Sequence, residues 1–552
     1  MPETTPFEIC DRLTEAYADL SPIAATEAGV PGRDHLWDDF SPDGEVAKEE
    51  LRAKAVAELA THFDHPDAVQ RTAARVASGY LASERRLYDS GHWKRNINHI
   101  HGPFQTARDT FDIVPKEGAE AWENVTIRLS TWGDMLDGYR SSLQMGLDEG
   151  EIVAHRQVLS VIDQVRSVAG PASRFSSLPG LAAADGGDEE GVAGAVSRAR
   201  SASAGFADWL ETVYLPRAVP SDAAGLDRYA EESERFLGMR LDVDDTYDWG
   251  WSEVHRLLGE MRETAAEIDA GLNIDEVIDL LDNDPGRSAP DHEAFADFVR
   301  EIQAHAVDRL DGTAFDVPPP MCDVTVNLAP PGGALGAWYV APSEDLDRAG
   351  SIWYALGERT RIPYWQEVAT AYHEGFPGHH LQVGIAVLQR EKLSRFHRLF
   401  VWYPGSGEGW ALYAERLMEE LGFFENPEYR LGLQASQLFR SARVVVDIGT
   451  HLEKRIPDDA PMHAGEVWNY ELAVDYMEKI GRQPRDLAES EVLRYLGWPG
   501  QAISYKVGER EILEIRKEAM TEAGASFDGK DFHRRLLDAG AIRLDQLRDT
   551  MA

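Results

Sequence analysis

Residues 369–383 read "ATAYHEGFPGHHLQV", and this stretch decides which architecture we expect for the chain. A His-Glu pair opens the H-E-x-x-H helix of many zinc hydrolases, in which two histidines four residues apart share one face. Here the fifth position of the motif is Pro377, and two histidines follow late, at 379 and 380. The stretch is either a metal site with an insertion or a turn that carries His and Glu by coincidence.

Helix geometry limits which histidines can act together. On an unbroken helix His373 and His379 would point to opposed sides, because six residues turn through about 600°. His380 would return to the same face but lie about 10 Å along the axis. Pro377 cannot continue a regular helix, however. We therefore predict a zinc-binding helix with a two-residue bulge, in which His373 and His379 are ligands and Glu374 is the general base; His380 is the alternative second ligand or a partner that orients one.

A third ligand is expected in "YPGSGEGWALYAERLMEELG", residues 403–422. Ser406 suits a helix N-cap, and apolar residues follow at helical spacing. Glu408 lies in the first turn, 29 residues after His379. Glu415, two turns on, shares the face of Glu408 and is placed to hold the free ring nitrogen of a ligand histidine. The competing interpretation is that Glu408 only complements the helix N-terminus.

The segment 431–455, "LGLQASQLFRSARVVVDIGTHLEKR", predicts a helix that is apolar on most sides. A single polar stripe crosses it, formed by Arg440, Arg443, Asp447 and His451 at three- and four-residue spacing. Buried charges are costly unless they are paired or functional. The stripe is therefore either a structural Arg443–Asp447 pair or the wall of a cavity in which an arginine binds a substrate carboxylate.

The segment 495–519, "YLGWPGQAISYKVGEREILEIRKEA", adds three polar candidates near a Pro-Gly helix start: Gln501, Tyr505 and Lys506. The Tyr505 phenol can donate a hydrogen bond to the oxyanion of a tetrahedral intermediate, or it can simply be a packing aromatic. Lys506 shares with Arg443 the expected role of holding a terminal carboxylate of the substrate.

Most of the chain reads as amphipathic helix, as over residues 45–63, 68–89 and 150–170. Strand signal is confined to 322–330 and 334–343, upstream of the His-Glu motif. We expect a mainly α fold with a small β-sheet near the site, in one large helical domain of residues 1–552. Two lobes, 1–320 and 321–552, are possible subdivisions. Residues 171–205, rich in Gly, Ala, Ser and Asp, read as a mobile surface segment or lid.

Composition excludes several classes of function. The formal net charge of −41 argues against nucleic-acid binding, which needs Lys and Arg. No apolar run reaches about 18 residues, so no membrane span is expected. The two cysteines offer neither a thiolate zinc site nor a disulfide framework. The first residues, "MPETTPFEIC", have no basic start and no apolar core of a secretory signal, so we expect a cytoplasmic protein.

Four motifs together resemble a known bacterial family, domain of unknown function 885. They are "HEGFPGHHLQ", "EGWALYAE", "RVVVDIGTH" and "WPGQAISYKVG", in this order between about 370 and 515, and "YVAPSEDLDRAGSIWY" before them is also similar. The family is thought to be related to helical zinc peptidases such as thermostable carboxypeptidase Taq. The resemblance implies an elongated, zincin-like helical fold around a deep cleft with one zinc ion at its base.

Residue by residue, the resemblance assigns His373, His379 and Glu408 as metal ligands, Glu374 as base and Tyr505 as the C-terminal phenol. We therefore expect a zinc-dependent peptidase of the carboxypeptidase or oligopeptidase type, acting on a peptide or other small substrate. Two alternatives stay open: a metal-dependent amidase or lyase acting on a small polar metabolite, and a non-catalytic binding protein with a vestigial site. A homodimer is expected only by analogy.

Overall fold

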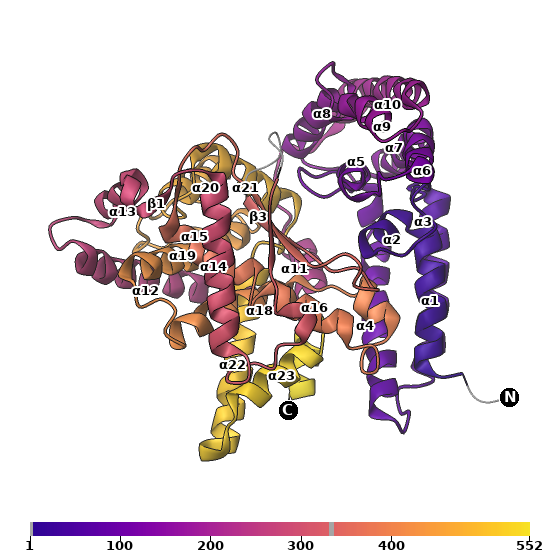
Figure 1. Ribbon diagram of the computed structural model, residues 1–552. Helices are drawn as coiled ribbons and strands as arrows, with labels where there is room; N and C mark the ends of the chain where they lie inside the picture. The colour runs from indigo at the N-terminus through magenta and orange to yellow at the C-terminus, as the bar shows by residue number, and fades with distance from the viewer. Residues whose placement is uncertain (1–3, 330–335, 552) are drawn as a thin grey trace. The chain divides into compact units, whose positions relative to one another are not determined.

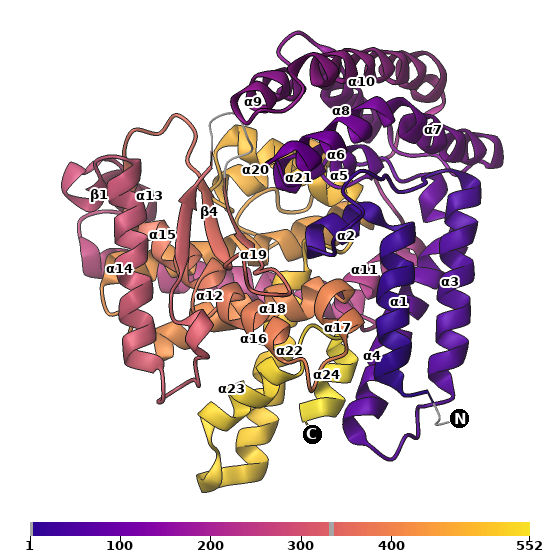
Figure 2. The same ribbon diagram turned by 45° about the vertical axis from the view of Figure 1, so that its right-hand side comes forward.

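The computed structural model describes residues 4–329 and 336–551, and these are mainly helical, with 68% helix and 4% strand. This confirms the predicted mainly α class with small sheets. The contacts between Cα atoms divide the chain into two compact units, whose helices are shown in Figures 1 and 2. Unit 1 holds the residues up to 224 together with 394–400 and 493–498, and unit 2 holds 225–393, 401–492 and the rest. The division thus falls near residue 224 and not at 320.

Unit 1 is built entirely from helices in the part that the structure describes. Its helices are α1 (Pro6–Leu20), α2 (Pro22–Ala28), α3 (Pro42–Ala60), α4 (Ala68–Asp89), α5 (Pro103–Ile113), α6 (Ala119–Ser130), α7 (Trp132–Glu149), α8 (His155–Ala169), α9 (Leu178–Ala184), α10 (Glu189–Trp209) and α17 (Arg395–Phe400). In both views α1, α3 and α4 run side by side (Figures 1 and 2). Helix α4 matches the expected residues 68–89 because Asp67 caps its first turn.

Residues 171–205 are helical over most of their length, in contrast to the loop that their composition predicted. A short 3₁₀ helix (Arg174–Ser177) leads into α9, and α10 starts after the N-cap Asp188, whose carboxylate accepts from the Gly191 amide at 3.0 Å. Alanine has the highest helix propensity, so a stretch rich in Ala forms helix once its ends are capped. The small side chains also allow α10 to bury Ala195, Ala199 and Ala207.

Unit 2 carries all the residues of the candidate site. Its helices are α11 (Leu226–Leu237), α12 (Val243–Ile268), α13 (Ile274–Asn283), α14 (His292–Leu310), α15 (Tyr364–Glu374), α16 (His379–Leu388), α18 (Pro404–Glu420), α19 (Pro427–His451), α20 (Tyr470–Lys479), α22 (Ser504–Ala523), α23 (Gly529–Asp538) and α24 (Leu544–Met551). Helix α21 (Arg485–Gly497) begins in unit 2, and its last residues belong to unit 1. No described helix is long and apolar enough to cross a membrane.

Two small sheets accompany the helices of unit 2. One pairs β1 (Ser288–Ala289) with β5 (Ile362–Pro363), and the other has the order β2 (Thr325–Leu328), β4 (Ser351–Ala355), β3 (Gly336–Val340). Strand β4 lies parallel to β2 and antiparallel to β3, with Ile352 opposite both Val326 and Tyr339.

The sequence predicted β2 and β3 but missed the central strand. Four of the five residues of β4 are buried, so it lacks the alternation that marks a half-exposed strand. The facing ends of the two expected segments, residues 330, 334 and 335, lie outside the described residues. Helix α14 covers the sheet, and Phe295 and Val299 share a buried cluster with Ile352.

The helices that carry the site are held by close contacts. Residues of α12, α15 and α19 form one buried cluster that includes Leu257, Trp365 and Leu438. Helices α18 and α22 cross at glycines: a Cβ atom on Gly409 would lie 2.6 Å from the Cα atom of Gly508. This close approach brings the start of α18, with Glu408, next to the start of α22, with Tyr505.

Candidate metal centre

The His-Glu motif spans a break between two helices and not a bulge within one. Helix α15 ends at Glu374, four residues form a turn, and His379 is the first residue of α16. The predicted single helix with a two-residue bulge is wrong in this respect: the interruption at Pro377, which cannot donate to the helical ladder, divides it into two helices. The turn is also tight: a Cβ atom on Gly378 would lie 1.9 Å from the His373 carbonyl oxygen. Two separate helices can each aim one histidine at a common point.

Side chains from two other helices hold this turn. Gln303 of α14 accepts a hydrogen bond from the Phe376 amide at 2.6 Å and donates to the Ala371 carbonyl at 2.8 Å. Trp410 of α18 donates its indole N–H to the Pro377 carbonyl at 2.9 Å. Neither contact was predicted from the sequence. A buried glutamine in the middle of α14 was the available signal, since a buried amide needs partners.

Three side chains converge on one point. The Nε2 atoms of His373 and His379 each lie 3.3 Å from the same Glu408 carboxylate oxygen. One ligand atom from each of these residues lies within 4.8 Å of the others, and this is the group among the described residues that could hold a metal ion. Two imidazoles and one carboxylate form a donor set typical of catalytic zinc sites, with a further position left for water or substrate.

The outer ring nitrogens of both histidines are oriented by further polar groups. The Nδ1 atom of His373 lies 2.7 Å from a Glu415 oxygen, and that carboxylate is fully buried. The Nδ1 atom of His379 lies 3.4 Å from the amide oxygen of Gln382, which the sequence analysis missed although it lies three residues later on the same helix. Such partners fix the tautomer and leave the Nε2 lone pairs for a metal.

Helix α18 starts earlier than expected. Its first residue is Pro404 and its N-cap is Tyr403, so Ser406 lies inside the first turn and donates to the Tyr403 carbonyl at 3.2 Å. Proline is favoured at the first helical position, where no amide hydrogen is needed. Glu408 nonetheless stays near the helix start and points at the two histidines.

Charges within this group of three side chains shift the pKa values of His373 and Glu408. Burial by itself lowers the pKa of His373, but the hydrogen bonds to Glu408 and Glu415 and the charges of nearby carboxylates outweigh it and raise the pKa to about 9. Burial would raise the pKa of Glu408, yet hydrogen bonds and charge from His373 and His379 hold it well below its usual range. Without a metal the site therefore keeps a proton that a cation would displace.

Glu374 lies beside these three residues, and its carboxylate is unpaired within the described ranges. Burial raises its pKa above the usual value, and the charges of His373 and His379 oppose that shift. The side chain is half-buried and forms no hydrogen bond or ion pair with any residue in the described ranges. A carboxylate with a raised pKa and unused lone pairs suits a general base.

His380 points to a different environment. Its Nε2 atom lies 3.2 Å from the Met321 carbonyl oxygen, and the Tyr339 ring meets it edge-on at 5.6 Å. Burial lowers its pKa, which favours the neutral imidazole. His380 is not among the residues that meet at Glu408, and the structure thus separates the two histidines that the sequence left as alternatives.

Tyr505 lies against His373, one of the three converging side chains. Its ring is stacked on the His373 ring, with 6.3 Å between centroids and 21° between planes. The guanidinium carbons of Arg440 and Arg443 lie 5.9 and 4.8 Å from the centroid of the Tyr505 ring. The first half of the polar stripe of α19 therefore faces the site.

The second half of the stripe, Asp447 and His451, makes structural contacts. The Asp447 carboxylate accepts hydrogen bonds from the Tyr229 hydroxyl at 2.7 Å and from the Gly500 amide at 3.0 Å. His451 is fully buried with its Nε2 atom 3.7 Å from Asp447. Gln501 is buried in the turn before α22, where its carbonyl accepts from the Ser504 amide at 3.1 Å. These contacts hold α11 and the turn before α22 against α19.

Two of the proposed carboxylate anchors are paired with acids. Arg443 donates to Glu491 at 2.8 Å, an ion-pair partner that the sequence did not predict. Lys506 is fully buried, forms a short ion pair with Glu509 at 2.5 Å and lies 3.3 Å from Glu253. Lys506 is thus part of a buried ion cluster, since a buried ammonium is tolerated only with such partners.

An exposed aromatic residue borders the site. Trp402 is 42% exposed, and its ring centroid lies 6.2 Å from that of His379.

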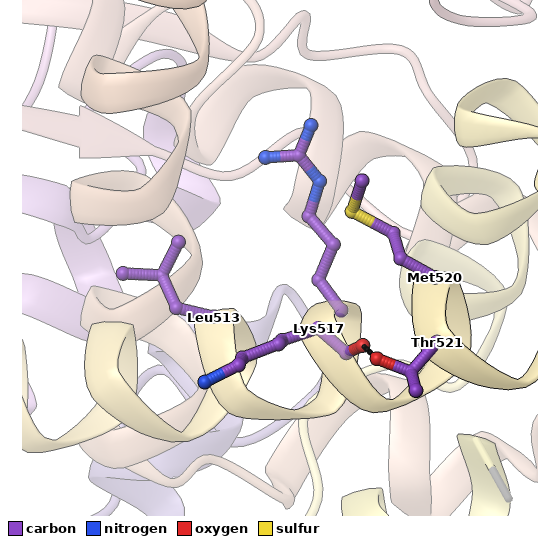
Figure 3. Close-up of a pocket in the computed structure, with 5 residues that line it drawn as sticks. Leu513, Lys517, Met520 and Thr521 are labelled. Atoms are coloured by element: carbon purple, nitrogen blue, oxygen red, sulfur yellow. Dashed lines mark hydrogen bonds between the residues drawn. The ribbon is translucent and has the colours of Figure 1, made fainter. Parts of the chain in front are cut away.

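A pocket of about 380 Å³ lies away from the site, on the outer face of α22. Five residues of that helix line it: Leu513, Arg516, Lys517, Met520 and Thr521 (Figure 3). Figure 3 shows Thr521 bonded back to the Lys517 carbonyl, a contact within one helix. This hollow has none of the convergent polar groups of a binding site.

Sequence comparison decides the family. A model described as "Bacterial protein of unknown function (DUF885)" matches residues 22–551. The chain belongs to the DUF885 family. No curated protein matches the sequence of this DUF885 protein. Its membership confirms the family resemblance of the four motifs, while a relationship to zinc peptidases stays a prediction.

Two solved structures share the fold of this DUF885 protein. One, from Colwellia psychrerythraea, is described as a "putative lipoprotein"; it is 21% identical with a TM-score of 0.84, over 100% of this chain and 99% of that chain. The other, from Shewanella oneidensis, is described as a "putative lipoprotein of unknown function"; it is 18% identical with a TM-score of 0.75, over 100% of both chains. At these identities the likeness is one of fold.

Proposed function

We propose that this DUF885 protein is a zinc-dependent hydrolase that cleaves peptide bonds. The observation that carries the proposal is the convergence of His373, His379 and Glu408 within 4.8 Å, with the open Glu374 carboxylate beside them. Two histidines and a glutamate are the ligand set of thermolysin-type peptidases. When bound, a zinc ion supplies a Lewis acid and lowers the pKa of a water molecule into the neutral range.

The chain's own residues have distinct parts in this proposal. Glu374 takes the proton of the attacking water and passes it to the leaving amine, because its carboxylate is open and its pKa is raised. Glu415 and Gln382 keep the two imidazoles in the ligating orientation. Tyr505, stacked on His373, donates a hydrogen bond to the oxyanion.

Metal content is the first test. Wild-type protein is expected to retain about one zinc ion per chain after zinc addition and dialysis, measured by plasma mass spectrometry. His379→Ala is expected to lose it, whereas His380→Ala, which changes the adjacent buried histidine, is expected to keep it. Zinc that persists in His379→Ala, or wild type without any zinc, contradicts the site.

Peptide cleavage is the second test. A synthetic peptide library and a panel of small polar amides are digested side by side, and products are identified by mass spectrometry. Cleavage of peptides supports a peptidase of the carboxypeptidase or oligopeptidase type. Cleavage of the small amides alone supports the alternative, a metal-dependent amidase. Full zinc binding with no cleavage of either supports a binding protein.

Location and assembly stay predictions. Composition leads us to propose a cytoplasmic protein, whereas the two structural relatives are described as lipoproteins. Fractionation of host cells decides between these compartments. A homodimer, expected by analogy, is tested by light scattering of the purified chain.

A further inference from the structure

We propose that Arg440 binds a carboxylate of the substrate, so that the site selects acid-bearing peptides. This inference rests on the proposed hydrolase function and adds its substrate class. The carboxylate is either the C-terminus, which makes the protein a carboxypeptidase, or an Asp or Glu side chain next to the scissile bond. Arg440 is thus a specificity-determining residue.

Arg440 forms no salt bridge with a carboxylate among the described residues. Its Nη1 atom donates to the Ser436 hydroxyl at 2.6 Å, and its Nε atom is buried with no hydrogen-bond acceptor among the described residues. Guanidinium groups bind carboxylates through two parallel N–H donors, and Arg440 has such donors to spare.

Two neighbouring cations differ from Arg440 because each is paired with an acid. Arg443, one turn along the same helix, pairs with Glu491, and Lys506 pairs with Glu509. The chain has 96 acidic and 55 basic residues, so an acidic partner is easily supplied where the fold needs one. An arginine that forms no salt bridge within the described chain, in an acidic protein and inside the site, points to an acid that arrives with the ligand.

The position of Arg440 places such an acid next to the reacting groups. Its guanidinium lies over the Tyr505 ring, and that ring is stacked on His373. Its charge also reaches the open carboxylate of Glu374. A substrate carboxylate on Arg440 would therefore lie close to a bond positioned at the three proposed ligands.

A structural role must be separated from this one. Ser436 links Arg440 to the metal group, because its hydroxyl also donates to Glu415 at 3.1 Å, and Glu415 holds His373. If Arg440 only orients this chain, then removal of the Ser436 hydroxyl should have the same effect. Ser436→Ala is therefore the matched control.

The experiment uses peptides of one sequence made in three forms: with a free C-terminal acid, with a C-terminal amide, and with the amide plus an acidic side chain near the C-terminus. Binding to zinc-loaded Glu374→Gln protein is measured by calorimetry, and kcat/KM is measured with wild-type catalytic residues. Each is repeated with Arg440→Gln, Arg440→Lys and Ser436→Ala. Zinc content is recorded for every variant.

An acid-bearing form is expected to bind and react roughly 10- to 100-fold better than the neutral amide, as for a charge-assisted hydrogen bond. Arg440→Gln is expected to abolish this preference with zinc retained, and Arg440→Lys to restore part of it. Ser436→Ala is expected to keep the preference. Which acid-bearing form is favoured identifies the C-terminus or the side chain as the source of the carboxylate.

Several outcomes overturn the inference. An unchanged preference in Arg440→Gln means that another group binds the acid, and an equal loss in Ser436→Ala means that Arg440 only positions the metal ligands. Equal binding of all three peptide forms to protein with Arg440 unchanged means that the site does not recognise carboxylates. Failure of the proposed function differs from all of these: zinc is bound and no peptide is cleaved, while calorimetry still reports on Arg440.

Discussion

At the scale of single residues, Glu374 gives the clearest test, because it lies beside the proposed ligands and forms no ion pair among the described residues. Changing Glu374 to Gln removes the proposed base but leaves the proposed ligands His373, His379 and Glu408 in place. We expect unchanged zinc content and a loss of kcat of roughly 100- to 10,000-fold, which is the usual contribution of general acid–base catalysis. Plasma mass spectrometry and a peptide-cleavage assay measure the two quantities on the same samples.

A control on the same helix is available for this prediction. Glu367 is also a glutamate whose pKa is raised by burial, but it pairs with Arg359 at 3.6 Å, two turns before the site. Glu367→Gln should leave turnover unchanged. Full turnover by zinc-loaded Glu374→Gln would remove Glu374 from the mechanism.

At the scale of elements, the turn between α15 and α16 sets the ligand geometry. Gly378→Ala forces a methyl group against the His373 carbonyl oxygen, 1.9 Å away, so the turn must open. We expect a loss of roughly 1–3 kcal/mol in the free energy of unfolding, as for other overpacked sites, together with weaker zinc binding. Urea unfolding and a zinc competition titration measure these effects.

The matched control is a glycine in open space. A Cβ atom on Gly259, inside α12, would meet nothing within 4 Å. Gly259→Ala should stabilise the protein by roughly 0.5–1 kcal/mol through helix propensity and leave zinc binding alone. Zinc binding by Gly378→Ala that equals that of Gly259→Ala would mean that the turn does not set the ligand geometry.

The docking of α23 on α18 makes stability depend on pH. His533 is buried between Tyr413, whose hydroxyl lies 2.8 Å from Nε2, and the Ala314 carbonyl. Burial lowers its pKa from 6.5 to about 4. Between these values the unfolded chain binds a proton that the folded chain does not, so the folded state loses up to about 3 kcal/mol as the pH falls from 6.5 towards 4.

His533→Phe tests this pH dependence because phenylalanine cannot take up a proton. The free energy of unfolding of the variant should fall less than that of wild type between pH 7 and pH 4.5, where other groups titrate equally in both. Urea unfolding at several pH values gives the two slopes. Parallel slopes would show that His533 takes up a proton in the folded protein as readily as in the unfolded chain.

At the scale of the whole molecule, the chain leaves unit 2 between two of the proposed metal ligands and then returns. Residues 394–400 lie between His379 and Glu408 in sequence but belong to unit 1. Phe396 is fully buried there, with its ring 5.5 Å from that of Tyr17 and 6.0 Å from that of Tyr80. Phe396→Ala should cost roughly 3–5 kcal/mol of stability, as for other buried phenylalanines.

This cost should fall on unit 1 and not on the metal group. Hydrogen exchange read by mass spectrometry is expected to rise in α1 and α4 of the Phe396→Ala variant, with zinc content unchanged. Loss of zinc from this variant would show that the folding of unit 1 determines the ligand geometry in unit 2.

Local features were predictable because their physics is local. The bounds of α4 and the end of α8 at Gly170 follow from caps and periodicity, and the pairing of His373 and His379 with a later glutamate follows from the chemistry of zinc ligands. The mainly helical class follows in the same way from spacing along the chain. Residues 171–205 were misread because composition alone does not show that helix ends are capped.

Only the tertiary structure decided which charged residues remain for function. Arg443 and Arg440 look alike in the sequence, but Glu491, far along the chain, neutralises one and leaves the other. The break at Pro377 aims two histidines at one carboxylate because Gln303 and Trp410, both remote in sequence, hold the turn. Spacing along a chain determines helices and donor types, whereas partners brought together by folding determine which side chains are left free to bind.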